Sequence, residues 1–166
     1  MARAKFARVG GGWGETGNVV MELALVLPLL LLMLAGIVDL GTLYWEKQIL
    51  TNAAGEGARV ASRAAADGSA AQSAAQVMQI VQNQLDQYHL QDAGGSRIVL
   101  TSGSNFSYQW DATVTPAQLW VEIKNIPVGM LLLPSVLPLF GSGGDSSPPA
   151  LQAKTTLAAE WSTPPP

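Results

Sequence analysis

The N-terminal quarter of the chain contains one long apolar run. Residues 23–38 carry no charged side chain, and one acid, Glu22, stands at the beginning of the run. A membrane-spanning helix needs about 20 mostly apolar residues. Val19 to Val38 supplies that length when Glu22 is placed near one membrane edge. The pattern predicts a single transmembrane helix over residues 18–40.

Two residues modify this predicted span. Pro28 lies within it, and because proline lacks a backbone donor and clashes with the preceding turn, we expect a kink or local loosening of the helix there. A plain anchor that simply tolerates the proline is an equally good interpretation. Asp39 ends the uncharged run, and we expect its carboxylate to emerge into water at the far interface.

The helical period continues beyond the span as a stalk over residues 41–66. Apolar side chains recur there at intervals of three and four residues, with charged residues between them. The stretch is rich in alanine and contains Gly55 and Gly57, which permit close backbone approach. Since each glycine costs about 1 kcal/mol against alanine in a helix, we expect a packing surface, facing either the chain's own domain or another subunit.

Residues 67–166 show a helical period first and a strand period afterwards. Asp67 and Gly68 break the stalk, and Ser69 is a candidate N-cap for a second amphipathic helix over residues 70–90. Four strand-like segments follow: 97–101, 106–114, 119–126 and 153–161. We therefore expect an α+β fold, with a small antiparallel sheet packed on the second helix.

A second apolar stretch, Met130 to Phe140, contains two prolines and is too short for another span. We expect it to cover the sheet, and docking on the membrane or on a partner is the alternative. Residues 141–149 are rich in glycine, serine and proline and predict a mobile loop.

The residues before the apolar run have the composition of a leader peptide. Arg3, Lys5 and Arg8 make residues 1–17 basic, and the glycines between positions 10 and 14 oppose helix formation. Because basic flanks remain on the cytoplasmic side, we expect a cytoplasmic N-terminus and an extracytoplasmic C-terminal domain.

A cut between Gly17 and Asn18 would remove this leader and keep the anchor. The new amino group would then lie four residues, or about one helical turn, from Glu22. A carboxylate in hydrocarbon costs roughly 2.5–3.5 kcal/mol on insertion scales and therefore needs a partner. We expect that partner to be an amino terminus, of the same chain or of a neighbouring subunit. An ordinary signal-peptidase site at Ala35 and Gly36 is the less favoured alternative.

An ordered series of motifs resembles a known family. The series comprises Gly17 to Glu22 (GNVVME), Leu25 to Leu32 (LVLPLLLL), Gly36 to Gly41 (GIVDLG) and Leu50 to Arg59 (LTNAAGEGAR). It is similar to the TadE-like family of tight-adherence pilus assembly proteins, which are pilin-like minor components, or pseudopilins, of bacterial adhesion and secretion machines. The resemblance is strong over residues 15–65 and holds only in outline elsewhere.

This resemblance implies a structural subunit anchored in the bacterial inner membrane by a single pass, with a possible place in the pilus itself. It implies cleavage after Gly17 by a prepilin peptidase, so that Glu22 becomes the fifth mature residue. Other pilin-like subunits and pilus assembly proteins are the implied partners. Asn18 and Leu23 stand where many pilins have aromatic residues, which makes a major pilin less favoured. The alternative is a single-pass envelope binding module with no pilus role.

Other chemistry has little support in the sequence. The formal net charge of −3 does not favour binding to nucleic acid. Because the chain has no cysteine, thiolate chemistry and disulfides are excluded. Asp86, His89 and Asp92 are spaced three apart on the second helix, but structural zinc sites normally need four converging ligands. We expect no catalytic residue, cofactor or metal site, and a capping or solvated role for His89.

Overall fold

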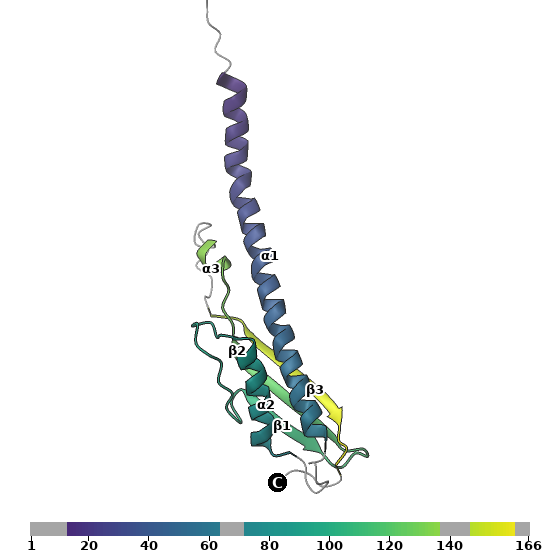
Figure 1. Cartoon of the computed structure of the whole chain (residues 1–166). Coiled ribbons are helices and arrows are strands. Elements are labelled where there is room, and N and C mark those ends of the chain that lie inside the picture. The colour runs from purple at the N-terminus through teal and green to yellow at the C-terminus, as the bar shows by residue number, and fades with distance from the viewer. Residues whose placement is uncertain (1–12, 64–71, 137–146, 162–166) are drawn as a thin grey trace, which may run out of the picture.

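The computed structural model describes residues 13–63, 72–136 and 147–161 of the chain. One long helix projects from a small head, in which the second half of this helix and a second helix cover a sheet (Figure 1). We call the projecting half of the long helix the shaft. The elements are α1 (Trp13–Ser62), α2 (Ala74–Gln87), β1 (Phe106–Asp111), β2 (Gln118–Pro127), α3 (Leu133–Val136) and β3 (Ala150–Ala158). This arrangement confirms the expected α+β class.

α1 is a single helix of 50 residues whose two halves have different surroundings. The helix continues through Pro28 and past the expected end of the span, so the anchor and the stalk are one element. The first half projects beyond the head, and the second half packs on β3, α2 and β2 (Figure 1). The packing surface expected over the stalk therefore faces the chain's own head.

Small side chains make this packing close. Ala53, Ala54, Ala58 and Ala61 are fully buried on one side of α1. A Cβ atom added to Gly57 would lie 2.4 Å from a methyl carbon of Val81 in α2, whereas one added to Gly55 would meet nothing within 4 Å. Of Gly55 and Gly57, only Gly57 is required by the contact between α1 and the head.

The sheet has the order β1-β2-β3 and is antiparallel throughout. In the central strand β2, Leu119, Val121 and Ile123 are fully buried beneath the helices, and the intervening side chains are partly exposed. The alternation predicted for this strand is therefore confirmed. A register shift after Ile123 accompanies the positive φ of 55° at Asn125.

α2 begins later than the sequence pattern suggested. Its N-cap is Ser73, which forms a capping box with Gln76: each side chain accepts a hydrogen bond from the other residue's backbone N–H. Ser69, the predicted cap, lies outside the described residues. The buried face of α2 consists of Val77, Val81 and Leu85, spaced at four residues.

The strand predicted over residues 97–101 is wrong. Ile98 and Leu100 are buried as a strand pattern requires, but the segment joins no ladder in the described sheet. The side-chain amide of Gln82 in α2 replaces the ladder: it donates to the carbonyl of Ile98 at 2.9 Å and accepts from the N–H of Leu100 at 2.8 Å. These bonds satisfy backbone groups that a neighbouring strand would otherwise have to pair.

The chain following β3 closes the C-terminal end of α1. β3 stops at Ala158, earlier than the expected 153–161 strand. The N–H of Glu160 donates to the carbonyl of Ser62 at 2.8 Å, and the buried indole of Trp161 donates to the carbonyl of Ala61 at 2.8 Å. Both bonds supply donors to carbonyls of the last helical turn, which lack partners within the helix.

The C-terminus of α2 ends in a Schellman motif centred on His89. The N–H of His89 donates to the carbonyl of Asp86, and that of Leu90 donates to Leu85, with His89 in the left-handed region at φ 51°. Leu85 and Leu90 are both buried, as the hydrophobic contact of this motif requires. The expected capping role of His89 is thus performed by its backbone.

The first prediction compares Gly55 and Gly57, the two glycines of the stalk part of α1 that lie beside the head. Gly57→Ala should lower the free energy of unfolding by about 1–3 kcal/mol, because the added methyl overlaps Val81. Gly55→Ala should raise it by up to about 1 kcal/mol, because alanine is the better helix former and has room. Urea unfolding of the full chain in detergent, followed by tryptophan fluorescence, measures both. Equal effects at the two positions would contradict the assigned close contact.

The second prediction concerns His89, the residue with a left-handed backbone conformation that follows α2. His89→Gly should raise the free energy of unfolding by about 1 kcal/mol, since glycine adopts a positive φ without steric cost. His89→Ala, which retains a Cβ, is the control and should leave stability nearly unchanged. The same unfolding assay applies. A loss of stability in both variants would mean that the imidazole makes a necessary contact.

Candidate functional site: the exposed apolar helix

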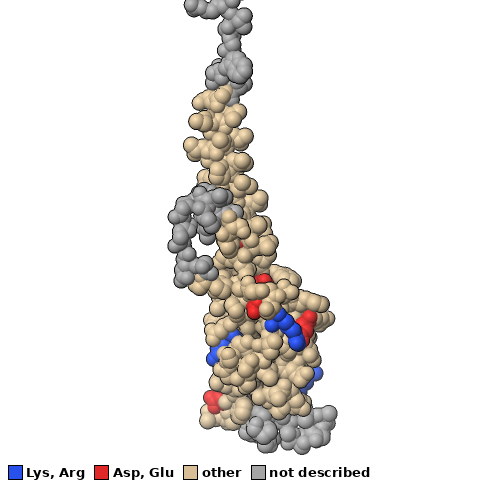
Figure 2. All heavy atoms as spheres, turned by 90° about the vertical axis from the view of Figure 1, so that its left-hand side faces the viewer, with Lys and Arg blue, Asp and Glu red and all other residues tan. Residues whose placement is uncertain are grey.

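The projecting half of α1 is apolar on every side. Exposed side chains on this part include Met21 at 74%, Leu25 at 80% and Ile37 at 66%. Figure 2 shows a shaft whose upper part carries no visible charge, while blue and red side chains gather on the head. By length and composition, α1 is the one helix in the described part of the chain that could cross a membrane. A helix that is hydrophobic all round is typical of such a span.

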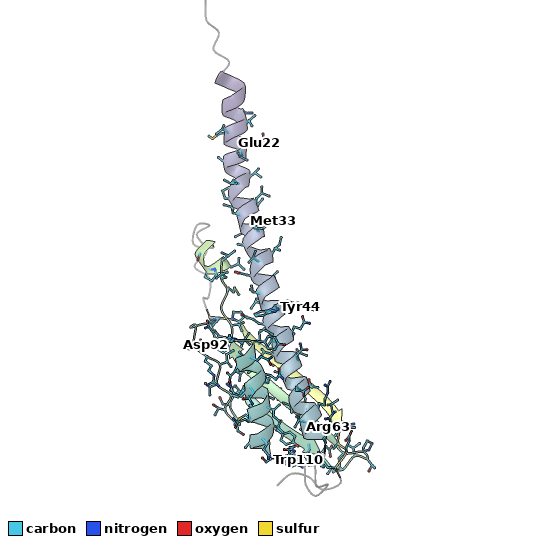
Figure 3. The ribbon with its side chains drawn as sticks, in the orientation of Figure 1. Glu22, Met33, Tyr44, Arg63, Asp92 and Trp110 are labelled. Carbon is cyan, nitrogen blue, oxygen red and sulfur yellow. The ribbon has the colours of Figure 1, made fainter. Side chains whose placement is uncertain are left out.

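The predicted processing residues lie near the start of this half. Gly17 and Asn18 are exposed within α1, and Glu22 follows Asn18 by four residues; Figure 3 shows Glu22 near the free end of the helix. Helical spacing therefore places Asn18 and Glu22 on one face, about one turn apart. α1 already begins at Trp13 and includes Gly14, so the prediction that the glycines exclude a helix is wrong there. Residues 1–12 lie outside the described part.

Asp39 does not emerge into water, contrary to expectation. It is fully buried, and its carboxylate accepts hydrogen bonds from the backbone N–H groups of three consecutive residues. Oδ1 accepts from Leu131 at 3.0 Å and Leu132 at 2.9 Å, and Oδ2 from Leu132 at 3.2 Å and Leu133 at 2.6 Å. We call this set of bonds the Asp39 clamp.

The clamp gives hydrogen-bond partners both to the buried carboxylate of Asp39 and to backbone N–H groups at the start of α3. A buried carboxylate is costly unless hydrogen bonds replace its hydration, and bonds to an ionised acceptor are the stronger kind. The first N–H groups of α3 have no partner within that helix, and the preceding Leu132 has no side-chain acceptor. The sequence signal that could have been noticed is the absence of a capping side chain just before Leu133. It indicates that an acceptor from elsewhere in the chain bonds these N–H groups.

The clamp also determines where the second apolar stretch lies. α3 packs on α1, beside the shaft and beyond the end of the sheet (Figure 1). For its described part, the prediction that Met130 to Phe140 covers the sheet is therefore wrong, because Asp39 draws the segment toward the anchor. Leu131 is 68% exposed. Residues 137–146, which include most of the predicted mobile loop, lie outside the described part.

The junction between shaft and head contains an aromatic pair and a shallow cavity. Tyr44 is 73% and Trp45 54% exposed, and Figure 3 places Tyr44 where α1 meets the head. A cavity of about 260 Å³ is lined by Trp45, Glu46, His89, Leu90, Gln91, Asp92 and Gly129. Burial raises the pKa of Glu46. The cavity lining contains no serine, threonine, cysteine or lysine that could act as a nucleophile.

Asp86 and Asp92, two of the three potential ligands spaced around His89, have other partners in the structure. Asp86 forms an ion pair with Arg97 and accepts from Gln82 at 3.0 Å, and the bond from Arg97 lowers the pKa of Asp86. Asp92 accepts from the N–H groups of Gly94 and Ser96 and so closes its own turn. Within the described ranges, no group of three or more potential ligands converges.

Comparison with known proteins agrees with the features of α1. Residues 17–59 match the family model described as TadE-like protein; they contain the apolar span, Asp39 and most of the small-residue face. Among curated proteins and solved structures, no significant match was found. The matched family is pilin-like and structural, and it is not known for enzymes. The similarity to the TadE-like family therefore covers residues 17–59 of the chain.

Proposed function

We propose that the protein is a membrane-anchored, pilin-like structural component of a bacterial tight-adherence pilus assembly or secretion system. The observation that carries the proposal is the projecting half of α1, which is apolar on every side and lies within the family match. Such a surface is stable only in lipid or among other apolar helices. A pilin-like subunit uses both environments in turn.

In this proposal residues 1–17 are a cytoplasmic leader and residues 18–40 cross the inner membrane. The stalk, 41–66, and the distal domain, 67–166, then lie on the extracytoplasmic side. The basic residues of the leader support this orientation. A prepilin peptidase removes the leader after Gly17, and pilus assembly proteins transfer the anchored subunit to its pilin-like partners.

Glu22 then sets the register of the anchor against its neighbours. No hydrogen bond or ion pair to Glu22 exists among the described residues, and Glu22 lies 27 residues, or about 40 Å along the helix, before Ile49, where the continuous buried face begins. The head is therefore too distant to supply a partner for this acid. The amino group of Asn18, in the same chain or in an adjacent subunit, has the required charge.

The third prediction tests processing. Gly17→Val should leave an unprocessed, membrane-bound chain, since a Cβ branch replaces the smallest residue at the cut. Gly36→Val is a matched control, because an added Cβ meets nothing within 4 Å at either glycine. Mass spectrometry of the chain purified from its native host locates the amino terminus. A normal Asn18 terminus in the Gly17 variant would contradict the assigned site.

The fourth prediction separates anchoring from assembly. Glu22→Gln should retain membrane insertion but reduce crosslinking to pilin partners severalfold, because it keeps the shape and removes the charge. Met21→Gln, at a neighbouring exposed position, is the control and should assemble normally. Crosslinking and recovery in a pilus-containing fraction measure the effect. Wild-type assembly of the Glu22 variant would favour the envelope binding module over the pilus subunit.

A further inference from the structure

The depth of each residue of α1 in the membrane follows from helix geometry. A hydrocarbon core about 30 Å thick corresponds to about 20 residues at 1.5 Å each. The span proposed above, residues 18–40, is slightly longer than this minimum and ends one helical turn before Tyr44. Tyr44 and Trp45 are both well exposed. Exposed tyrosine and tryptophan side chains are enriched at membrane interfaces, so this aromatic pair marks the extracytoplasmic boundary just beyond the span.

The Asp39 clamp lies on the membrane side of that boundary. Asp39 precedes Tyr44 by five residues and is therefore about 8 Å closer to the bilayer centre along the helix. Its carboxylate bonds the backbone of Leu131, Leu132 and Leu133 directly. The segment around these residues is thus held at the depth of Asp39, inside the boundary marked by the aromatic pair.

The chemistry of the segment suits that depth. Residues 125–144 contain no charged side chain, and Leu131 is 68% exposed in the isolated chain. Irregular backbone is tolerated at membrane depth only where its polar groups have partners, and the clamp satisfies three consecutive N–H groups. Asp39 itself is fully buried, so this capping takes place out of contact with water.

We propose that residues 130–135 are a second membrane contact, which inserts beside the anchor among the lipid chains of the extracytoplasmic leaflet and is held there by Asp39. Leu131 contacts lipid directly. The proposal rests on the anchoring role of α1 proposed above and adds a lipid-binding surface that belongs to the distal domain.

A probe at Leu131 tests this contact in the full chain. The chain has no cysteine, so Leu131→Cys gives a single attachment point for an environment-sensitive fluorophore. The labelled protein is reconstituted in phosphatidylethanolamine and phosphatidylglycerol vesicles that contain lipids with nitroxide-labelled acyl chains. We expect strong quenching by these lipids and little quenching by aqueous iodide.

Two further positions calibrate the measurement. Leu40→Cys, on the anchor and 66% exposed, should be quenched by the lipid nitroxide, and Val114→Cys, 42% exposed in the turn after β1, should be quenched by iodide. Leu131 should behave like Leu40. If Leu40 is lipid-exposed and Leu131 is iodide-accessible, the second contact is overturned while the anchor stands. If neither is lipid-exposed, the anchoring role fails as well.

Asp39→Asn tests the clamp. The amide keeps one acceptor oxygen and replaces the other with a donor that opposes the N–H groups. In this background the Leu131 probe should lose most of its lipid quenching, and the Leu40 probe should keep it. Asp86→Asn, which removes an acid from the head, is the control. Unchanged quenching at Leu131 would overturn the role of Asp39 in holding the segment.

Protection of the Leu131 probe from both quenchers would overturn lipid contact in favour of a protein neighbour. Crosslinking between two copies through Cys at this position would identify that neighbour as a second copy of the chain. The wild-type background decides between lipid, water and protein without the Asp39 variant, so the test holds even if that variant folds poorly.

Discussion

The contact between the small-residue face of α1 and the head is the constraint on which the rest of the structure depends. Ala54, Ala58 and Ala61 are fully buried there, and Gly57 has no room for a methyl group beside Val81. Because this face lies on the same unbroken helix as the apolar span, no flexible linker separates the anchor from the head. The anchor and the sheet are therefore joined through one helix, an arrangement that suits the proposed packing of subunits through α1.

Local pattern was sufficient to predict most of this architecture. The apolar run, the small residues of the stalk and the alternation around Val121 each depend on neighbours within one or two turns or within one strand, so their period is visible in the sequence. The fate of residues 97–101 was not predictable in this way. Their apolar side chains are buried as in a strand, but the amide of Gln82 supplies their hydrogen bonds. A glutamine on a helix surface gives no sign of such a distant role.

The residues of the candidate site also differ in whether local pattern or distant contacts determine their surroundings. Gly17, Asn18 and Glu22 form a series within one and a half helical turns, so sequence reasoning can propose them together as a processing and register site, and that role stays a prediction. Asp39 was found but misinterpreted, since its partners are more than 90 residues away. The physical reason is that an acid at the end of an apolar run has two ways to avoid an unfavourable burial: it can reach water, or it can find backbone donors. Only the path of the chain around Leu132 decides between them.

The two acids of the span have opposite hydrogen-bonding states, and this difference is consistent with the different roles proposed for them. Asp39 is already saturated by N–H groups of its own chain, so it gains little from an external cation. Glu22 is exposed and has no partner within the described chain, and in hydrocarbon that state is costly. Assembly that provides Glu22 with an amino group therefore gains free energy that is not available to the isolated subunit. The same assembly leaves the clamp intact, since breaking it would leave both a buried carboxylate and three N–H groups unsatisfied. In the proposed assembly residues 130–135 would therefore remain beside α1, because the clamp joins their backbone to Asp39.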